Sequence, residues 1–213
     1  MAGDEIGFHP VVAALYDPVQ WYFERVQAPE HRAYLAAGLD GRVLEIGVGT
    51  GAMLPYYEGG IESGADIHGV EPDPTMWQRA REKIADSTVD MQLVSARGES
   101  LPYEDDSFDY VVECGVFCSV PSIPPMLSEV ARVLRDGGEF RFLDHVRSDG
   151  LVGRSQDALT PLWRRIGGNC HLNRRVRPLL ETSDRLTLEE FDRPTIGYWP
   201  IRKFARGTAT LSG

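Results

Sequence analysis

Short apolar runs alternate with longer mixed stretches through the middle of the chain. The runs at 42–46, 66–70, 90–94, 108–113 and 139–146 are rich in β-branched residues, which is typical of buried strands. The stretches between them carry helix-compatible patterns rather than hairpin turns. Strands that alternate with helices predict an α/β fold, in which helices cover both faces of a parallel sheet.

Turn and cap signals predict where the helices begin and end. A helix-compatible stretch near 52–57 follows the first strand, and Pro74 can open a helix over 75–84. A helix over 123–134 ends at the glycine-rich turn 136–138. Outside this central region the pattern predicts helix starts at Asp17-Pro18 and Pro29-Glu30, helices over 153–166 and 172–182, and strands over 186–191 and 202–211.

Chain length and composition limit the classes of protein that remain. The 213 residues are 42% hydrophobic, which is enough for one sizeable core, and we find no repeats or Gly/Ser linkers. The formal net charge of −10 argues against a nucleic acid partner, because no basic excess is present to release counterions. No apolar run is long enough for a membrane span, and the N-terminus carries acids instead of a signal sequence, so a cytoplasmic protein is expected.

The cysteines give no metal signal along the sequence. Cys114 and Cys118 are spaced CxxxC, and Cys170 stands alone, with no second pair and no histidine ladder beside them. The spacing therefore predicts neither a disulfide framework nor a metal site.

A glycine-rich turn follows the first strand. Gly47, Gly49 and Gly51 alternate with other residues, and such a turn lets a ligand approach the backbone closely because no Cβ occupies its space. Glu71 ends the second strand, where a carboxylate can accept hydrogen bonds from both ribose hydroxyls. The two signals together predict a nucleotide-type site. Gly47, Gly49 and Ala52 also satisfy the dinucleotide fingerprint, so an NAD-type oxidoreductase stays open at this point.

Four blocks of sequence resemble the class I S-adenosylmethionine-dependent methyltransferases. They are VLEIGVGTG at 43–51, GVEPDP at 69–74, ESLPYEDDSFDYVV at 99–112 and EVARVLRDGGEFRFLDHV at 129–146. The resemblance implies one methyltransferase domain over 1–213, with a doubly wound, mostly parallel seven-stranded sheet and an antiparallel C-terminal strand. It divides the chain into an N-terminal helical lid (1–40), a cofactor-binding core (41–146) and an acceptor region with the last two strands (147–213). Only about 65 residues follow the fifth strand, which fits this family better than an oxidoreductase with a substrate domain.

Three shorter segments are similar to the thiol methyltransferase branch of that superfamily. They are CSV at 118–120, DHV at 144–146 and GGNCHLNR at 167–174. They imply methyl transfer to a small molecule, such as a lipophilic thiol. A neighbouring branch that methylates quinone precursors and lipid head groups shares the central blocks and remains an alternative. A protein that binds the cofactor without turning it over is a second alternative, because Arg97 stands where the family often has an acid.

The resemblance also assigns S-adenosylmethionine, with S-adenosylhomocysteine as product, to particular positions. Glu45 would hold the amino group, the three glycines would pass beneath the methionine portion, and Glu71 would bind the ribose. Met76 is similar to the residue that covers an adenine face, and the backbone of 97–98 would reach the adenine edge. The full set implied for the cofactor is Tyr16, Glu45, Gly47, Gly49, Gly51, Glu71, Pro72, Met76, Arg97, Gly98, Glu99 and Cys114.

His145 and Asp144 are the candidate catalytic residues. They stand at the carboxyl end of the fifth strand, the edge at which open α/β sheets bind ligands, and histidine has a suitable intrinsic pKa for a base. His171 is a second candidate. An apolar acceptor pocket is expected from the aromatic residues Trp21, Phe117, Trp163, Tyr198 and Trp199.

Overall fold

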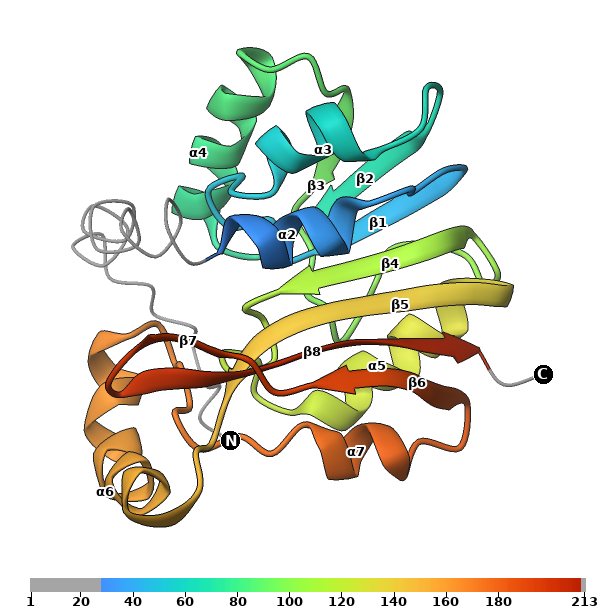
Figure 1. The fold of residues 1–213 in the computed structure, drawn as a ribbon. Helices are drawn as coiled ribbons and strands as arrows, with labels where there is room; N and C mark the ends of the chain where they lie inside the picture. Colours follow the sequence, from blue (N-terminus) through green and yellow to red (C-terminus); the bar gives the residue numbers. More distant parts are fainter. Residues whose placement is uncertain (1–27, 212–213) are drawn as a thin grey trace, which may run out of the picture.

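The computed structural model describes residues 28–211, and Tyr16, Asp17 and Trp21 lie outside this range. Up to Val146 helices and strands alternate, except that the third and fourth strands are joined by the loop 95–107 (Figure 1). In chain order the elements are α2 (Pro29–Ala36), β1 (Arg42–Ile46), α3 (Leu54–Gly60), β2 (Asp66–Val70), α4 (Pro74–Ala85), β3 (Met91–Val94), β4 (Phe108–Cys114), α5 (Ile123–Val133), β5 (Leu134–Val146), α6 (Gly150–Ile166), α7 (Arg177–Glu181), β6 (Leu186–Asp192), β7 (Thr195–Tyr198) and β8 (Ile201–Leu211).

All the strands belong to one sheet, in the order β3-β2-β1-β4-β5-β8-β6. The strands β1 to β5 pair in parallel, and β8 enters antiparallel between β5 and β6. The predicted mostly parallel sheet with an antiparallel C-terminal strand is therefore confirmed. An eighth strand, the short β7, also pairs with β8. It was not predicted, because its four residues do not form a separate apolar run in the sequence.

β1 is buried on both faces, as a central parallel strand must be. Val43 packs with α3 and β2 in one core cluster, whereas Leu44 and Ile46 pack with α5 and β5 in a second cluster on the opposite face. Because side chains alternate along a strand, Glu45 shares the face of Val43. A carboxylate is therefore placed in the layer that contains α2 and α3.

The segment 172–182 differs from its predicted single helix. Only Arg177–Glu181 is helical, with Pro178 in its first turn. The backbone groups before this helix make hydrogen bonds to distant segments. The Arg174 carbonyl accepts a hydrogen bond from Arg147 N, and His171 N donates to the Cys118 carbonyl. These long-range bonds replace the hydrogen bonds that a helix would have made.

The boundary between α5 and β5 also differs from the prediction. The strand begins at Leu134, which pairs with Phe108, and not at Glu139. Gly137, at φ +76, lies in the irregular stretch before Glu139 pairs with Tyr110. The glycines here carry the strand through a change of register after the helix has already ended.

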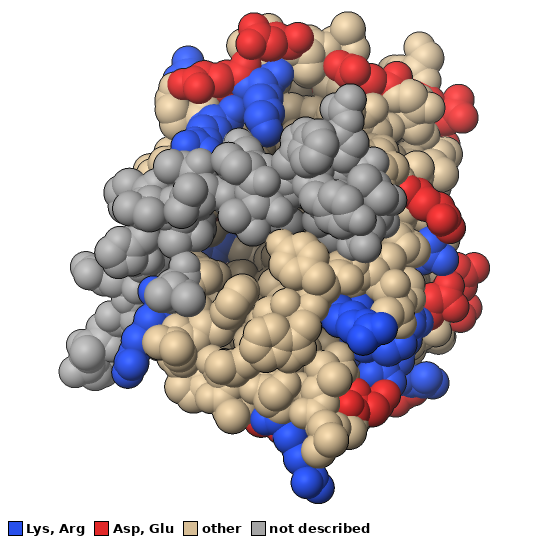
Figure 2. All heavy atoms as spheres, turned by 60° about the vertical axis from the view of Figure 1, so that its left-hand side comes forward, with Lys and Arg blue, Asp and Glu red and all other residues tan. Residues whose placement is uncertain are grey.

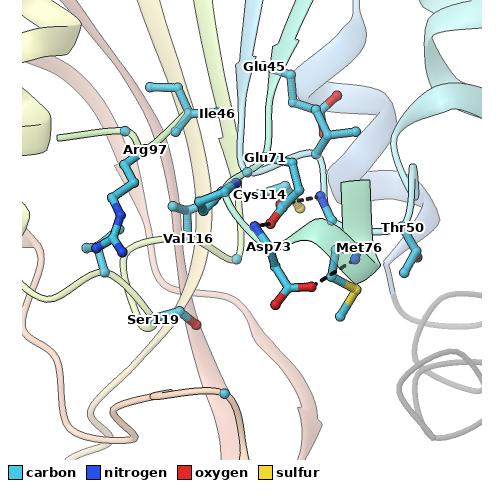
Figure 3. Close-up of a pocket in the computed structure, with 18 of the residues that line it drawn as sticks. Glu45, Ile46, Thr50, Glu71, Asp73, Met76, Arg97, Cys114, Val116 and Ser119 are labelled. Atoms are coloured by element: carbon cyan, nitrogen blue, oxygen red, sulfur yellow. Dashed lines mark hydrogen bonds between the residues drawn. The ribbon is translucent and has the colours of Figure 1, made fainter. Parts of the chain in front are cut away.

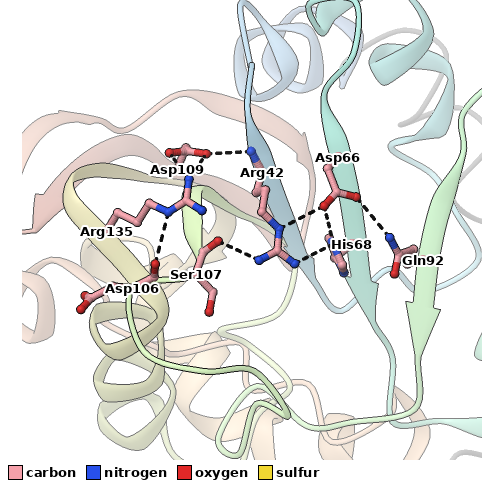
Figure 4. A network of polar contacts seen from close by, with 8 residues as sticks. All are labelled: Arg42, Asp66, His68, Gln92, Asp106, Ser107, Asp109 and Arg135. Carbon is pink, nitrogen blue, oxygen red and sulfur yellow. Dashed lines mark hydrogen bonds and ion pairs between the residues drawn. The ribbon is translucent and has the colours of Figure 1, made fainter.

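The amino ends of the strands are joined by a network of polar side chains (Figure 4). Arg42 donates to Asp66 Oδ2 at 3.0 Å and to the Ser107 carbonyl at 3.2 Å, and its backbone N donates to Asp109 Oδ2 at 2.7 Å. Arg135 donates to the same Asp109 carboxylate. The network therefore ties β1, β2, β4 and β5 together at the edge of the sheet opposite the loops that follow these strands.

Candidate functional site

A pocket opens at the carboxyl ends of the parallel strands. It is formed by the loops that follow β1, β2, β3 and β4, together with Gly167 and Gly168 after α6. Figure 2 brings this edge of the sheet forward and shows Lys, Arg, Asp and Glu side chains mostly around the border of the described surface, with uncharged residues on part of it. This is the position at which open α/β sheets place their ligands.

The glycine turn forms the floor of the pocket beside β1. Gly47, Gly49 and Gly51 all have positive φ, at +72, +60 and +77, so each adopts a conformation that L side chains avoid. A Cβ on Gly47 would meet Val116 at 2.5 Å, whereas a Cβ on Gly49 would meet protein atoms only at ordinary contact distance. Gly49 therefore leaves open space on the pocket side, as the sequence predicted for a ligand-binding turn.

Gly51 has a different role from the predicted one. It is buried, does not line the pocket, and a Cβ there would meet Leu54 Cδ1 at 2.8 Å. Its N–H donates to the Val48 carbonyl and closes the turn. Gly51 thus lets α3 pack beneath the turn.

Glu71 connects the first two loops of the pocket (Figure 3). Its Oε2 accepts a hydrogen bond from Gly49 N, and its Oε1 accepts one from Asp73 N, both at 2.9 Å. Burial raises the pKa of Glu71, and these two backbone donors oppose that rise. The carboxylate is held firmly while each oxygen keeps a lone pair for a further donor.

Asp73 begins α4 and lines the pocket. Its Oδ1 accepts hydrogen bonds from Thr75 N and Met76 N, which caps the helix. The cap places Met76, only 4% exposed, against the pocket wall. Asp73 was not predicted as a site residue, although an aspartate just before Pro74 is a helix-start signal that could have located it.

Glu45 is a buried acid at the back of the pocket. Burial raises its pKa to about 8, although Tyr57 and the Arg32 guanidinium favour the charged form. Its Oε2 has no hydrogen-bond partner of ordinary geometry among residues 28–211. The carboxyl group is therefore suited to receive a cation from a ligand, which would restore its charge.

The wall opposite the acids is formed by two loops with small or apolar residues. The residues of this wall are Val116, Ser119, Val120, Pro121, Gly167 and Gly168. Two buried carboxylates hold the first loop by its backbone: Glu113 Oε2 accepts from Val116 N, and Asp144 Oδ2 accepts from Cys118 N, each at 3.0 Å. In the described part of the chain, this wall carries no carboxylate side chain.

The segment after β3 closes the pocket between the two walls. Gly98 packs against the end of β1, where a Cβ would meet Ile46 Cγ2 at 2.8 Å, and Arg97 is exposed. In Figure 3 the Arg97 side chain lies on the side of Val116 and Ser119, away from Glu71 and Asp73.

Most of the residues predicted to bind cofactor meet in this pocket. Those that line it are Glu45, Gly47, Gly49, Glu71, Pro72, Met76, Arg97, Gly98, Glu99 and Cys114. Gly51 lies beneath it, and Tyr16 lies outside the described residues. Arg32, Thr50 and the wall of residues after β4 were not predicted to line the pocket, although Ser119, Val120, Gly167 and Gly168 belong to the segments CSV and GGNCHLNR.

The two residues predicted to be catalytic lie behind the pocket wall. Asp144 is fully buried and its carboxylate holds Cys118 N, while His145 is 5% exposed and its Nε2 lies 3.0 Å from Cys170 Sγ. Neither is among the lining residues. His171, the second candidate, places Nδ1 at 3.0 Å from the Cys118 carbonyl. A direct catalytic role for these residues stays a prediction.

The expected aromatic pocket is wrong for the aromatic residues that the structure describes. Phe117 is fully buried and packs against Phe140 and Phe142. Tyr198 and Trp199 are about half exposed, at the turn between β7 and β8, and neither they nor Trp163 line the pocket. Trp21 lies outside the described range.

Comparisons with known proteins agree with this geometry. Residues 44–142 match the family described as "Methyltransferase domain". Thiol S-methyltransferase TMT1B of Rattus norvegicus is 31% identical over 175 residues, which cover 78% of this chain and 69% of that protein. Phosphatidylethanolamine N-methyltransferase of Cereibacter sphaeroides is 34% identical over 130 residues, which cover 60% of this chain and 62% of that protein.

A solved structure supports the fold assignment independently. A SAM-dependent methyltransferase from Thermotoga maritima superposes with a TM-score of 0.66 at 21% identity and covers 94% of this chain and 97% of its own. The pocket combines open space at Gly49, an anchored carboxylate at Glu71 and, at Glu45, a buried carboxyl group with one oxygen that has no hydrogen-bond partner among residues 28–211. The chain therefore belongs to the class I methyltransferases that use S-adenosylmethionine as cofactor, and it resembles the thiol S-methyltransferase TMT1 branch of that family.

Proposed function

We propose that this enzyme transfers the methyl group of S-adenosylmethionine to the sulfur of a small thiol. One observation carries the choice of acceptor: the similarity to the TMT1 thiol S-methyltransferase extends over 175 residues, well beyond the 99 residues of the shared domain at 44–142. It therefore includes segments outside the cofactor-binding core. The match to the phosphatidylethanolamine enzyme is shorter, at 130 residues.

The acidic half of the pocket is the proposed cofactor side. We assign the ribose hydroxyls to Glu71, whose two oxygens are already fixed by Gly49 N and Asp73 N. Glu45, together with the backbone at Cys114, faces the amino group of the methionine portion, and Met76 covers the adenine. Adenine recognition falls to the backbone of 97–99 because the Arg97 side chain is exposed.

The wall of Val116, Ser119, Val120, Pro121, Gly167 and Gly168 is the proposed acceptor side. Its lack of a carboxylate, within the described residues, disfavours a protonated amine, which needs both a counter-charge and a base. A thiol has an ordinary pKa near 8.5 and ionises partly at neutral pH, so it requires little more than alignment. Alignment alone is worth roughly 7–11 kcal/mol of the barrier.

The bound cofactor supplies a sulfonium methyl group, which is displaced as the new carbon–sulfur bond forms. The task of this chain is to hold the acceptor sulfur in line with the carbon–sulfur bond that breaks. Glu113 and Asp144 contribute by fixing the backbone of the loop after β4 through Val116 N and Cys118 N. His145 and Asp144 therefore enter the proposal as positioning residues behind the acceptor wall.

The cofactor assignment is tested by Glu71→Gln, with the exposed Glu62→Gln as a matched control. Loss of an acceptor for the ribose should weaken binding of S-adenosylmethionine and S-adenosylhomocysteine by about 1–3 kcal/mol, or roughly 5- to 150-fold. Calorimetry measures both affinities, and NAD serves as a competing ligand. Unchanged affinity in folded Glu71→Gln would remove Glu71 from the site.

The acceptor is tested by a methyl-transfer screen with mass detection of product. Small thiols, phenols, amines, quinols and lipid head groups are offered at equal concentration. We expect methyl thioether from the thiols. Product from phenols, amines, quinols or head groups alone would contradict the sulfur assignment, and cofactor binding without product from any class would favour a non-catalytic binding protein.

A further inference from the structure

Three side chains that are distant in sequence meet behind the acceptor wall. They are Cys118 in the loop after β4, His145 near the end of β5 and Cys170 after α6, and their sulfur and ring-nitrogen atoms all lie within 4.8 Å of one another. His145 Nε2 lies 3.0 Å from Cys170 Sγ. The three residues are 5%, 5% and 8% exposed.

Backbone hydrogen bonds bring the two sulfur atoms together. His171 N donates to the Cys118 carbonyl at 2.7 Å, and Asn169 Nδ2 donates to the Ser119 carbonyl at 2.8 Å. On the other side, Asp144 holds Cys118 N, so the residue before His145 fixes the loop that carries the first thiol. The cluster is therefore built by contacts on each side of both cysteines.

His145 Nε2 is directed at Cys170 Sγ, while Cys118 Sγ lies near both and also contacts the Gly115 carbonyl and Ser119 Oγ. The imidazole ring packs edge-on against Phe204, and its Nδ1 has no hydrogen-bond partner in the part of the chain that the structure describes. Cys118 and Cys170 are both free thiols. A buried imidazole turned toward two thiols is an arrangement that apolar packing does not require.

Two thiols and one imidazole nitrogen are the donor set of a borderline-soft divalent cation. Zinc binds thiolate sulfur at about 2.3 Å and imidazole nitrogen at about 2.0–2.1 Å, and it accepts four tetrahedral ligands. Calcium and magnesium prefer oxygen ligands, which this cluster does not offer. Two thiolates and a neutral imidazole around a doubly positive ion carry no net charge, which suits a buried site.

We propose that Cys118, His145 and Cys170 bind one zinc ion, with water as the fourth ligand. The ion would join the loop after β4 to the loop after α6. Both loops reach the pocket, through Val116 to Pro121 on one side and Gly167 to Gly168 on the other. The metal therefore fixes the acceptor wall from behind, and this role does not depend on which acceptor the enzyme uses.

The test uses the full-length chain, reduced and freed of metal. Zinc is titrated against a chromophoric chelator, and cobalt(II) replaces it as a spectroscopic probe. We expect one equivalent of either metal, with the intense thiolate-to-cobalt charge-transfer absorption and the visible bands of a tetrahedral ion.

Matched variants separate this site from adventitious binding. Cys118→Ala and Cys170→Ala should each weaken zinc binding by roughly 100-fold or more, because changes to supporting partners alone already cost 10- to 100-fold. His145→Cys should keep zinc through three thiolates. Cys114→Ala removes the third cysteine, which lies outside the cluster, and should retain the full equivalent of metal. Thermal unfolding of each variant verifies that it is folded, and Cys170→Ala with His145→Cys carries the test if Cys118→Ala does not fold.

Several results would overturn the proposal. They are no metal uptake by the reduced wild-type chain, equal loss in Cys114→Ala, or uptake without the thiolate charge-transfer absorption. Formation of a Cys118–Cys170 disulfide on treatment with peroxide, in a chain that binds no zinc, would assign the cluster to redox chemistry instead. Metal uptake is measured without cofactor or acceptor, so a failed thiol screen leaves this result intact.

Discussion

The pKa values of carboxyl groups are shifted in opposite directions at the two ends of the parallel strands. At the amino end, the pKa of Asp66 is lowered by His68 and Arg42, and backbone and side-chain donors from Arg42 and Arg135 outweigh burial to lower that of Asp109. At the carboxyl end, burial raises the pKa of Glu45 and Glu71. The first set is already paired and stabilises the fold, whereas the second is paired incompletely and keeps capacity for a ligand.

These two environments lie on one strand, at Arg42 and Glu45, which are three positions apart in β1. Arg42 begins β1 and supplies hydrogen bonds to two neighbouring segments, while Glu45, near its end, is enclosed beside Tyr57. The difference teaches that stability and ligand binding are assigned to opposite edges of the same sheet. Substitutions of the network at the amino edge should therefore leave ligand binding at the other edge nearly unchanged.

The largest effect is expected at the glycine turn. Gly49→Ala places a Cβ in the open space of the pocket and should weaken S-adenosylmethionine binding by roughly 5- to 150-fold, the equivalent of about 1–3 kcal/mol of overpacking. Gly38→Ala is a matched control, since Gly38 is exposed with φ +63 and has open space around it. Each variant should lose about 1–2 kcal/mol of stability from the left-handed conformation. Calorimetry should find a changed affinity in Gly49→Ala alone; equal affinities would mean that Gly49 does not face the cofactor.

The next effect tests the amino end of the strands. Arg42→Met removes the hydrogen bonds to Asp66 and the Ser107 carbonyl and should lower the free energy of unfolding by about 1–3 kcal/mol. The cofactor affinity of the folded variant should stay within about twofold, because the pocket lies at the other edge. Denaturant titration and calorimetry measure the two quantities, and the exposed Arg185→Met serves as control. A large loss of affinity would break the separation of the two edges.

A pH dependence should follow from Glu45. With a pKa of about 8 in the cofactor-free protein, Glu45 is mostly protonated at pH 7. A cationic amino group beside it favours the ionised form, so binding releases a proton and affinity rises as pH increases toward 8, by at most about tenfold per unit. Stability of the cofactor-free protein changes the other way, falling as pH rises from about 4.5 to 8. Glu45→Gln should flatten both profiles; an unchanged affinity profile would separate Glu45 from the amino group.

The smallest effect is expected at Arg97. Its side chain is exposed and lies away from Glu71, so Arg97→Ala should change cofactor affinity by no more than about threefold. Gly98→Ala should have a larger effect, because a Cβ would press on Ile46. A strong loss in Arg97→Ala would show that the side chain, and not the backbone, recognises the adenine.

Local chemistry predicted the α/β fold and a ligand site at the glycine turn and Glu71, whereas the resemblance to class I methyltransferases supplied the other residues expected to bind cofactor. The short apolar runs predict the bounds of β1 to β4 within a residue or two. The glycine turn directly follows β1 and Glu71 directly follows β2, so each could be placed at the pocket from its neighbouring strand. Gly51 lies beneath the turn, against Leu54 of α3, and not on the surface of the pocket. The predicted helix is absent over 172–176, and there a contact remote in sequence replaces it, because the Arg174 carbonyl accepts a hydrogen bond from Arg147 N.

The cysteine cluster shows the limit of spacing rules. Cys118 and Cys170 are 52 residues apart, and His145 stands between them on a different element, so no short motif connects the three. The absence of a metal signal in the sequence followed from treating spacing along the chain as the only indicator. The segments CSV and GGNCHLNR indicated the branch of the family, but only the fold shows that their residues Ser119, Val120, Gly167 and Gly168 form one wall of the pocket.

The way in which Glu113 and Asp144 hold the loop after β4 has an evolutionary consequence. Both carboxylates bind backbone N–H groups, at Val116 and Cys118, and any residue other than proline carries such a group. The side chains of this loop that line the pocket, at Val116, Ser119, Val120 and Pro121, can therefore change by mutation while Cys118, the buried Phe117 and the path of the loop are kept. A lineage with this fold can explore new methyl acceptors through neutral steps, without first having to rebuild the loop that presents them.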